Sequence, residues 1–512
     1  MTISLRDYQM RGVDRVRLSF RGGNRAPLIV SPTGSGKGRI IAYIASGAAG
    51  KGKRVVVGAH RFELVSQLSG NLTDLGINHG LIVPGVTPNQ HAKIQVASIP
   101  ALVSRMKKRE FLADMFLVDE AHHVLPGNGW GKVYAGLGNP LMVGFTASPI
   151  RGDSKGLGLQ AGGLFDDMLE LVSVQELIDD GFLVSPTVYA PSHAIDLSGV
   201  HKRGGDYERK ELADRVDRPS ITGDAVDHYR RICPGTPAVA FGVSIEHCHH
   251  IAEEFQKAGF NFQVIDGTMD DGPRRKLIKG LGRDITGLVS ADLIGEGVDI
   301  PAIGCAILMR PTQSVGLHIQ QCGRALRPIY APGFDTSTAA GRKLALAAAG
   351  KTSAFIIDHV GNCLRLGLPQ TPREWSLDEG EKAKPKKKKD EEPTVPVRQC
   401  GTCYAVFAPA PVCPHCGAVQ ESQARKVEVT DGELRMVTAD EERAIAEQKK
   451  AEAAAVAKKR RMEVGQAKTL DDLKKIEGER GYKPGWAEHV WQTKASNRDA
   501  QTASWVENYG RR

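Results

Sequence analysis

A glycine-rich segment near the start of the chain, SPTGSGKG at residues 31–38, has the residue types and order that bind phosphate groups. It follows an apolar run, APLIV, and precedes the helical pattern RIIAYIASGAA, so the sequence predicts a strand, a loop and a helix in succession. In that arrangement backbone N–H groups and the positive end of the helix converge on phosphates. Lys37 would then reach the β- and γ-phosphates of a bound nucleotide. The residues expected to line this phosphate site are Pro32, Thr33, Gly34, Ser35, Gly36, Lys37 and Gly38.

Two carboxylates follow a second apolar run, in LVDEAHH at residues 117–123. This order puts Asp119 and Glu120 at the carboxyl end of a predicted strand. Asp119 is expected to bind Mg²⁺, directly or through water, and Glu120 to polarise an attacking water molecule. By itself an acidic pair at a strand end is often an ordinary surface feature. Its position downstream of a phosphate loop favours the catalytic interpretation.

Position 38 departs from the usual pattern of a phosphate loop. That pattern ends in Gly-Lys-Ser or Gly-Lys-Thr, whereas this chain has glycine after Lys37. The hydroxyl that would touch Mg²⁺ is therefore missing. Either magnesium is held through water and Asp119 alone, or ATP hydrolysis is weakened or lost. The presence of the other catalytic motifs favours retained activity.

Two arginines in QQCGRALRP at residues 320–328 form the other charged constellation. Arg324 and Arg327 are three residues apart, so they lie on one face of a helix. Such a pair can act as arginine fingers when a cleft closes on ATP. The alternative is a salt bridge to a neighbouring lobe.

The elements that must position these residues are short apolar runs separated by helical patterns, which is typical of a parallel sheet covered on both faces. We therefore predict the α/β class, with two consecutive α/β units before residue 376. The first series of candidate strands comprises residues 26–30, 54–59, 93–98, 115–120 and 141–146. The second series comprises residues 236–242, 261–266, 285–291, 304–309 and 353–359.

The remaining part of the chain divides into three segments. Residues 376–398 contain a lysine-rich, proline-containing run that cannot bury surface, so we expect a charged linker. Residues 419–512 are expected to form a charged helical tail, because the run at 440–464 is rich in Ala, Glu and Lys and predicts a charged helix. Between them, residues 399–418 carry two Cys-x2-Cys pairs, which predict a small zinc ribbon. The expected Zn²⁺ ligands are Cys400, Cys403, Cys413 and Cys416.

Composition narrows the class of partner and the compartment. A formal net charge of +9 and a pI near 9.0 fit a polyanionic partner, although many basic proteins bind no nucleic acid. No apolar run approaches the roughly 18 residues of a membrane span, and the N-terminus lacks the apolar core of a signal peptide. Cysteine usage suits a reducing compartment. We expect a cytoplasmic protein of a bacterial or phage-infected cell, associated with the nucleoid and not with membranes.

The DEAH sequence at 119–122, together with SPTGSGK, resembles the superfamily 2 helicases, and further motifs follow in that family's order. RDYQ resembles the segment whose glutamine reads adenine, which implies nucleotide contacts from Arg6 and Gln9. Other family motifs imply further ATP-site residues at His122, Gly297 and Asp299, with Gln320 as a catalytic residue beside the arginines. The strand-tracking motifs and motifs III and V imply nucleic-acid contacts from His60, Arg61, Ser98, Thr146, Ser148 and Ser290.

This resemblance covers residues 4–365 and implies two tandem RecA-like P-loop domains, at 1–183 and 184–375, that use ATP and Mg²⁺. The order of RPTQSVGLHIQQCGRALRP, FIIDHVGN and a cysteine module is most similar to bacterial RadD-like repair helicases and phage helicases. It implies an ATP-driven helicase or translocase on single-stranded, forked or branched DNA. An RNA helicase, a non-hydrolysing ATP-responsive clamp and the motor of a restriction complex stay open. A protein partner for the zinc ribbon or the tail also stays open.

Overall fold

The computed structural model describes most of the chain up to residue 381 and short segments beyond it. Before residue 381 the gaps are residues 1–3, 88, 90, 109, 152–154, 192–196, 198–199, 204–205, 218, 292–299, 301 and 379. After residue 381 the described residues are 398–399, 406–407, 434–437, 467, 469–479, 487–488 and 490–492.

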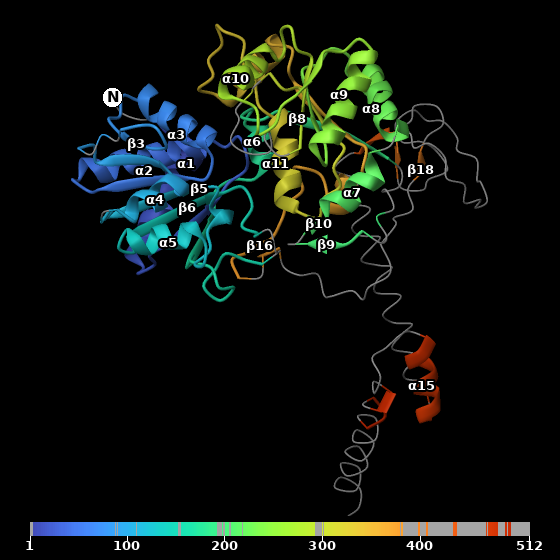
Figure 1. Ribbon diagram of the computed structural model, residues 1–512, viewed down its shortest axis with the longest axis horizontal. Coiled ribbons are helices and arrows are strands. Elements are labelled where there is room, and N and C mark those ends of the chain that lie inside the picture. Colours follow the sequence, from blue (N-terminus) through green and yellow to red (C-terminus); the bar gives the residue numbers. More distant parts are fainter. Residues whose placement is uncertain are drawn as a thin grey trace, which may run out of the picture. The chain divides into compact units, whose positions relative to one another are not determined.

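Seven parallel strands form the first sheet, in the order β3-β4-β2-β5-β6-β1-β7 (Figure 1). All five strands predicted in this part are confirmed, whereas β3 and β7 were not predicted. Strand β7, with the sequence DMLE, has a charged residue at each end instead of an apolar run. Since β1, β6 and β5 are neighbours, the segments that follow them meet at one edge of the sheet. The strands are β1 Pro27–Val30, β2 Val55–Ala59, β3 Gly80–Ile82, β4 Ile94–Ser98, β5 Met115–Asp119, β6 Leu141–Thr146 and β7 Asp167–Glu170.

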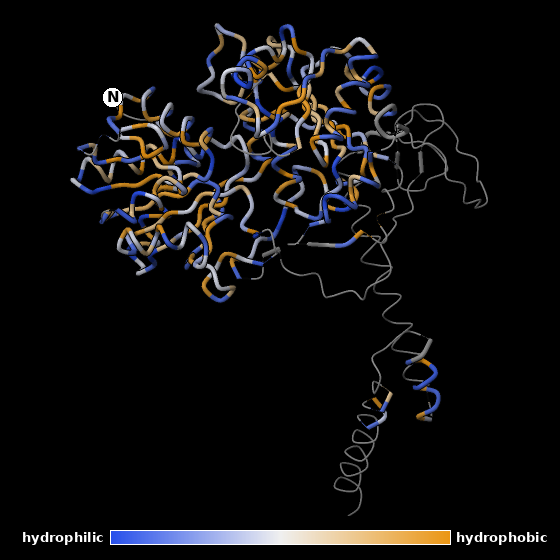
Figure 2. Tube along the Cα trace, in the orientation of Figure 1, coloured by the Kyte–Doolittle hydropathy of each residue, from blue (hydrophilic) through white to orange (hydrophobic). Residues whose placement is uncertain are grey.

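Helices cover both faces of this sheet, as the continuous apolar strands require. In β1, Ile29 points into a core with α1, α2 and α3, while Leu28 and Val30 point into a second core with α4 and α5. Figure 2 shows the apolar segments concentrated along the strands inside each lobe. The helices are α1 Asp7–Arg21, α2 Lys37–Gly50, α3 Phe62–Asp74, α4 Ile99–Met106, the 3₁₀ turn η1 Ala121–His123 and α5 Gly129–Gly136.

A second seven-stranded sheet follows, in the order β12-β13-β11-β14-β15-β8-β20, parallel except for β20. The five predicted strands are again confirmed. The strands of this part are β8 Ser185–Pro191, β11 Ala238–Phe241, β12 Phe262–Val264, β13 Gly287–Ser290, β14 Cys305–Leu308, β15 Ser353–Asp358 and β20 Leu434–Val437, with a small hairpin of β9 Lys202–Arg203 and β10 Asp206–Tyr207 and a second pair, β16 Trp375–Ser376 and β17 Gly380–Glu381.

The second sheet also separates two cores. Val239 and Phe241 of β11 face one core, and Ala238 and Ala240 face the other. The first of these cores reaches back to Leu177 in α6, ahead of the lobe boundary expected at residue 183. The helices are α6 Val174–Asp179, α7 Arg209–Val216, α8 Pro219–Ile232, α9 Ile245–Lys257, α10 Asp271–Gly280, α11 Val315–Ala325, α12 Ala339–Ala348 and α13 Asn362–Leu366.

The segment predicted as a helical tail, residues 419–512, is not helical throughout. Leu434–Val437 forms β20, which pairs antiparallel with β8 and so closes one edge of the second sheet. The Ala-, Glu- and Lys-rich run that predicted a helix, residues 440–464, lies outside the described residues. A four-residue edge strand such as β20 is specified by its partner rather than by its own pattern. Farther on, α15 Leu470–Glu479 is a helix, and the buried Leu473 and Ala487 share its small unit.

The cysteine module is described only in part. Strands β18 Arg398–Gln399 and β19 Val406–Phe407 pair antiparallel on either side of the first Cys-x2-Cys pair. The four predicted zinc ligands, Cys400, Cys403, Cys413 and Cys416, lie outside the described residues. In the described parts of the chain no helix is both long and apolar enough to cross a membrane.

Gly144 of β6 is tightly packed in the core of the first lobe, and its substitution tests that packing. A Cβ atom at Gly144 would lie 2.4 Å from a ring atom of Phe165 and 2.8 Å from Leu28. We expect Gly144→Ala to lower the free energy of unfolding by about 1–3 kcal/mol, because buried overpacking forces neighbours to move. Urea denaturation followed by circular dichroism measures this. The control is Gly47→Ala in α2, where no described atom lies within 4 Å; alanine there should stabilise by about 0.5–1 kcal/mol. Equal stability of the two variants would contradict the packing argument.

Candidate functional site

The phosphate loop connects β1 to α2 in the predicted strand–loop–helix order. Gly34 and Gly36 have φ angles of 88° and 78°, a left-handed conformation that favours glycine. The hydroxyl groups of Ser31 and Ser35 are buried, and among the described residues neither has a hydrogen-bond partner. Buried polar groups normally find a partner, so these two hydroxyls fit an absent polar ligand such as a phosphate.

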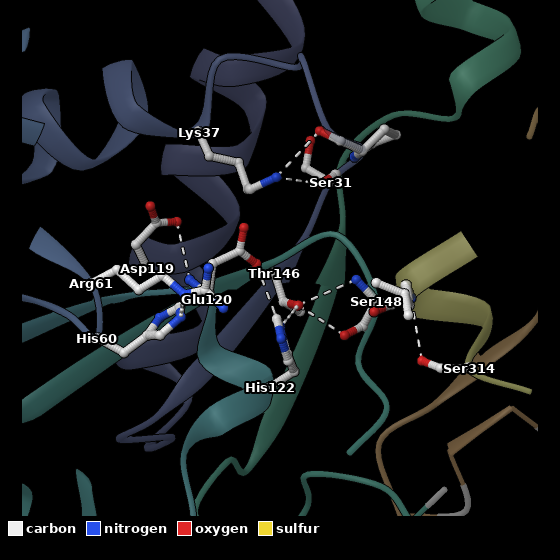
Figure 3. Close-up of polar contacts among 12 residues, drawn as sticks. Ser31, Lys37, His60, Arg61, Asp119, Glu120, His122, Thr146, Ser148 and Ser314 are labelled. Atoms are coloured by element: carbon white, nitrogen blue, oxygen red, sulfur yellow. Dashed lines mark hydrogen bonds and ion pairs between the residues drawn. The ribbon is translucent and has the colours of Figure 1, made fainter. Parts of the chain in front are cut away.

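Lys37 lies in the first turn of α2 and bends back over the loop. Its Nζ donates to the carbonyl oxygens of Ser31, at 3.1 Å, and Pro32, at 3.3 Å (Figure 3). Burial lowers the pKa of Lys37, and the charges of Glu120 and Asp119 act in the opposite direction. The nearby positive charges of Arg327 and Arg324 lower the pKa of Lys37 further. An anion placed among these groups would stabilise all three cations.

The acidic pair lies where β5 ends, beside the phosphate loop. Asp119 is buried, and burial followed by the charge of Glu120 raises its pKa to about 6. Glu120 itself has φ 51° and ψ 53°, a left-handed conformation that is uncommon for a residue with a side chain. Such strain, of about 1–3 kcal/mol, is typical of functional sites. These carboxylate oxygens are ligands that Mg²⁺ prefers, and a divalent cation would offset the cost of burying them.

A polar chain leads from Glu120 to the end of β6. Nδ1 of His122 lies 3.4 Å from Glu120 Oε2 and 3.2 Å from Thr146 Oγ1 (Figure 3). The Thr146 hydroxyl donates to the carbonyl oxygen of Ser148, at 2.8 Å, and accepts the Ser148 N–H, at 3.2 Å. Thr146 and Ser148 are both buried, and Thr146 connects His122 to the Ser148 backbone.

Helix α11 of the second lobe contacts this region through glycines. A Cβ atom at Gly316 would lie 2.4 Å from the Ser148 hydroxyl oxygen, and one at Gly323 would lie 3.1 Å from Thr33 Cβ. The two glycines are seven residues apart, about two helical turns, so one face of α11 meets the first lobe. Gln320, which is buried, lies between them on that face by its spacing.

Both arginines predicted as fingers are near the phosphate loop. Two atoms of the Arg327 side chain, Cδ and Nε, lie 3.5 Å from the position of a Cβ atom at Gly34. Arg324 is buried in the last turn of α11, whereas Arg327 follows the end of that helix at Ala325, so the prediction that both lie on one helix face is wrong. Both arginines still act electrostatically on Lys37. The structure therefore brings together the cationic and acidic residues that the sequence analysis singled out from opposite halves of the chain.

The first helix supports the phosphate loop from the other side. Gln9 Nε2 donates to the carbonyl oxygen of Ser35 at 2.9 Å, and Gln9 Oε1 accepts the Arg6 N–H at 3.0 Å. The Tyr8 hydroxyl donates to the same Ser35 oxygen at 2.5 Å. Gln9 is buried and both ends of its amide are engaged, so in this structure it holds the loop.

Sequence reasoning missed an aromatic platform beside Arg6. The guanidinium carbons of Arg6 and Arg342 each lie 3.8 Å from the ring centroid of Phe182. These are cation–π distances, and they link α1 to α12 of the second lobe. No motif marks Phe182 or Arg342, because the pairing depends on residues far apart in the chain.

The residues predicted to contact nucleic acid all lie at the carboxyl ends of strands. His60 and Arg61 follow β2 and are half-buried, and the His60 ring lies 4.3 Å from that of His123, which the sequence analysis left without a role. Ser98 and Ser290, the last residues of β4 and β13, are buried. The predicted nucleotide contacts Gly297 and Asp299 lie outside the described residues.

Two aspartates at opposite ends of β5 have pKa values shifted in opposite directions, and the pH dependence of thermal stability tests both shifts. Because Asp119 has a folded-state pKa of about 6, above its ordinary 3.8, its ionisation destabilises the fold increasingly from pH 4 to 6 and fully above. We expect Asp119→Asn to raise the melting temperature at pH 7.5 by at least about 2 °C, and to lose this gain below about pH 4.

The matched control is Asp114, where β5 begins. Hydrogen bonds from Arg54 lower its pKa to about 2, so its ionised form stabilises the fold above pH 4 and this contribution is lost as pH falls through 2. Asp114→Asn should therefore lower the melting temperature at pH 7.5. Thermal melts across pH 4–8 check both signs, and a destabilising Asp119→Asn would show that burial does not dominate at that carboxylate.

Comparisons with known proteins identify relatives of both lobes. Residues 2–151 match the family described as type III restriction enzyme, res subunit, and residues 225–328 match the helicase conserved C-terminal domain. A 51.5 kDa protein of a Lactococcus phage is 30% identical over 395 residues, which cover 76% of this chain and 77% of that protein.

Two cellular relatives carry functional descriptions. The Saccharomyces cerevisiae protein IRC3, described as a candidate ATP-dependent helicase, is 25% identical over 63% of this chain, which spans about half (49%) of that protein's length. The DNA 3'-5' translocase XPB2 of Sulfurisphaera tokodaii is 23% identical over 64% of this chain and 79% of its own. With both lobes matched and a phage relative aligned over most of its length, the chain belongs to the superfamily 2 helicases, among those of the phage and repair kind.

Proposed function

We propose that this protein is an ATP-driven motor that moves along or remodels DNA. The observation that carries the proposal is the charge arrangement around Lys37. Arg327 of the second lobe lies against the phosphate loop, 3.5 Å from the position of a Cβ atom at Gly34, and Gly323 of α11 lies against Thr33. The charges of Asp119, Glu120, Arg324 and Arg327 all shift the pKa of Lys37. A nucleoside triphosphate bound at the loop would therefore contact charged side chains from both lobes.

The roles of the residues follow from their positions. The loop backbone and Lys37 bind the phosphates, and Asp119 would hold Mg²⁺, which neutralises phosphate charge when bound. Glu120 would polarise the attacking water and accept its proton as the water oxygen bonds to the γ-phosphorus, while the bond from that phosphorus to the β-phosphate oxygen breaks and ADP leaves. Arg324 and Arg327 would stabilise the charge on the transferred phosphoryl group. The arginines engage only while the γ-phosphate is present, so hydrolysis weakens the contact between the lobes.

DNA is the proposed track. The relative from Sulfurisphaera tokodaii is described as a DNA translocase, and residues 2–151 match a restriction-enzyme family. Residues at the strand ends, with His60 and Arg61 foremost, are proposed to bind the nucleic-acid backbone. A net charge of +9 fits such contacts, which would make binding weakly sequence-specific and steeply salt-dependent.

Phosphate release with different nucleic acids tests the proposal. We expect single-stranded or forked DNA to stimulate the wild type more than RNA does, and stimulation to fall as salt rises. Lys37→Ala and Arg327→Ala should each reduce turnover by at least about 100-fold. The control is Lys51→Ala, an exposed lysine just after the same helix, which should leave turnover unchanged.

Each competing function has its own outcome in that assay. Stronger stimulation by RNA would identify an RNA helicase. If neither wild type nor Lys37→Ala releases phosphate, while the wild type still binds ATP, the protein is a clamp that does not hydrolyse ATP. A motor that hydrolyses ATP but moves or cleaves DNA only with an added subunit would belong to a restriction complex.

We further propose that residues 399–418 bind one Zn²⁺ through four thiolates. The Cys-x2-Cys spacing supports this, and a short segment with little apolar content needs a metal to fold. The ribbon would then bind nucleic acid or a protein partner.

Metal analysis of the purified chain tests the ribbon. We expect about one zinc ion per chain, released by a thiol-reactive mercurial and bound by a chromogenic chelator. Cys413→Ser should lose the zinc, whereas Cys233→Ala, a buried cysteine of the second lobe, should retain it. Wild-type chain without zinc, after purification free of chelators, would contradict the proposal.

A further inference from the structure

The side chain of Asn71 occupies the space into which a side chain at position 38 of the phosphate loop would project. A Cβ atom built at Gly38 would lie 2.6 Å from Asn71 Nδ2 and 3.8 Å from Asn71 Cγ. Apart from the neighbouring residues of the helix, no other described residue has an atom within 4 Å of that point. A serine or threonine at position 38 would therefore collide with the Asn71 amide.

Core packing holds Asn71 in this position. Helix α3 buries Leu64, Val65, Leu68 and Leu72 in the same core that takes up the apolar face of α2. Asn71 precedes the last of these leucines and is half-buried toward Gly38. Its amide makes no hydrogen bond to another described residue, so it is available to a ligand.

The Asn71 amide can supply the oxygen ligand that glycine at position 38 cannot. In phosphate loops the residue at this position supplies an oxygen to Mg²⁺. A side-chain amide carries a carbonyl oxygen, which is also a ligand for hard cations, and rotation about its last bond exchanges the oxygen with Nδ2. Asp119 is the other oxygen donor expected at this site, and the Asn71 amide would add a second one from α3.

We propose that Asn71 replaces the missing hydroxyl of position 38, so that its amide oxygen binds Mg²⁺ or a water molecule in the metal's shell. The inference rests on the proposed ATP site. It explains why the chain can have glycine at position 38 while keeping Lys37, Asp119 and Glu120. Asn71 and Gly38 are then a matched pair, with the oxygen donor moved from one helix to the next.

Binding of a fluorescent ATP analogue at increasing Mg²⁺ concentration tests the pair on the full-length chain. We expect Asn71→Ala to raise the Mg²⁺ concentration for half-maximal binding by at least about tenfold, without changing the affinity measured in EDTA. Adding Gly38→Ser to Asn71→Ala restores a hydroxyl in the freed space and should reverse most of that loss. Thr73→Ala, an exposed position of the same helix, should behave like the wild type.

The outcomes separate this inference from the proposed function. An Asn71→Ala variant with wild-type Mg²⁺ dependence, or a folded double variant that recovers nothing, would overturn the role of Asn71 while nucleotide binding through Lys37 stands. Circular dichroism melts establish that each variant is folded. A wild type that binds no nucleotide even at high Mg²⁺ would overturn the proposed ATP site, and the role of Asn71 with it.

Discussion

The close approach of α11 to the phosphate loop sets the electrostatics of the whole site. Gly316 and Gly323 let this helix lie against Ser148 and Thr33 with no side chain between them. As a result Arg324 and Arg327 come within electrostatic range of Lys37. Three cations then face two carboxylates, and like charges at short range in a buried setting repel strongly. Phosphate is the ligand class that would make this arrangement favourable, so the proposed ATP site would couple nucleotide binding to the approach of the two lobes.

A chain of polar contacts beside the phosphate loop connects Glu120 with the surface of the first lobe that packs against α11. Glu120, in its strained left-handed conformation, lies next to His122, which contacts Thr146, and Thr146 is bonded to the Ser148 backbone. Ser148 in turn lies against α11. Glu120, Thr146 and Ser148 are buried and His122 is half-buried, and interactions among buried polar groups are stronger than in water. We expect a change in the conformation of Glu120 to alter the position of Ser148, where α11 of the second lobe packs.

Other contacts between the lobes lie outside this chain of bonds. Arg274 of α10 and Glu63 of α3 form an ion pair at 2.5 Å, with side chains only 12% and 24% exposed. Phe182 lies between the guanidinium groups of Arg6 and Arg342. Since α3 also carries Asn71, the helix that would complete the metal site is itself tied to the second lobe.

Local sequence determined the ten predicted strands, the phosphate loop and the carboxylates at the end of β5, because apolar runs, glycine order and strand–loop–helix succession are short-range properties. The two arginines were also identified from the sequence, but not their setting, because α11 ends at Ala325 and only Arg324 lies in the helix. Tertiary structure decided which groups meet across long separations: Asn71 with Gly38, Phe182 with two arginines, and β20 with β8. Those pairings depend on how helices and edges pack, and packing brings together residues that no spacing along the chain relates.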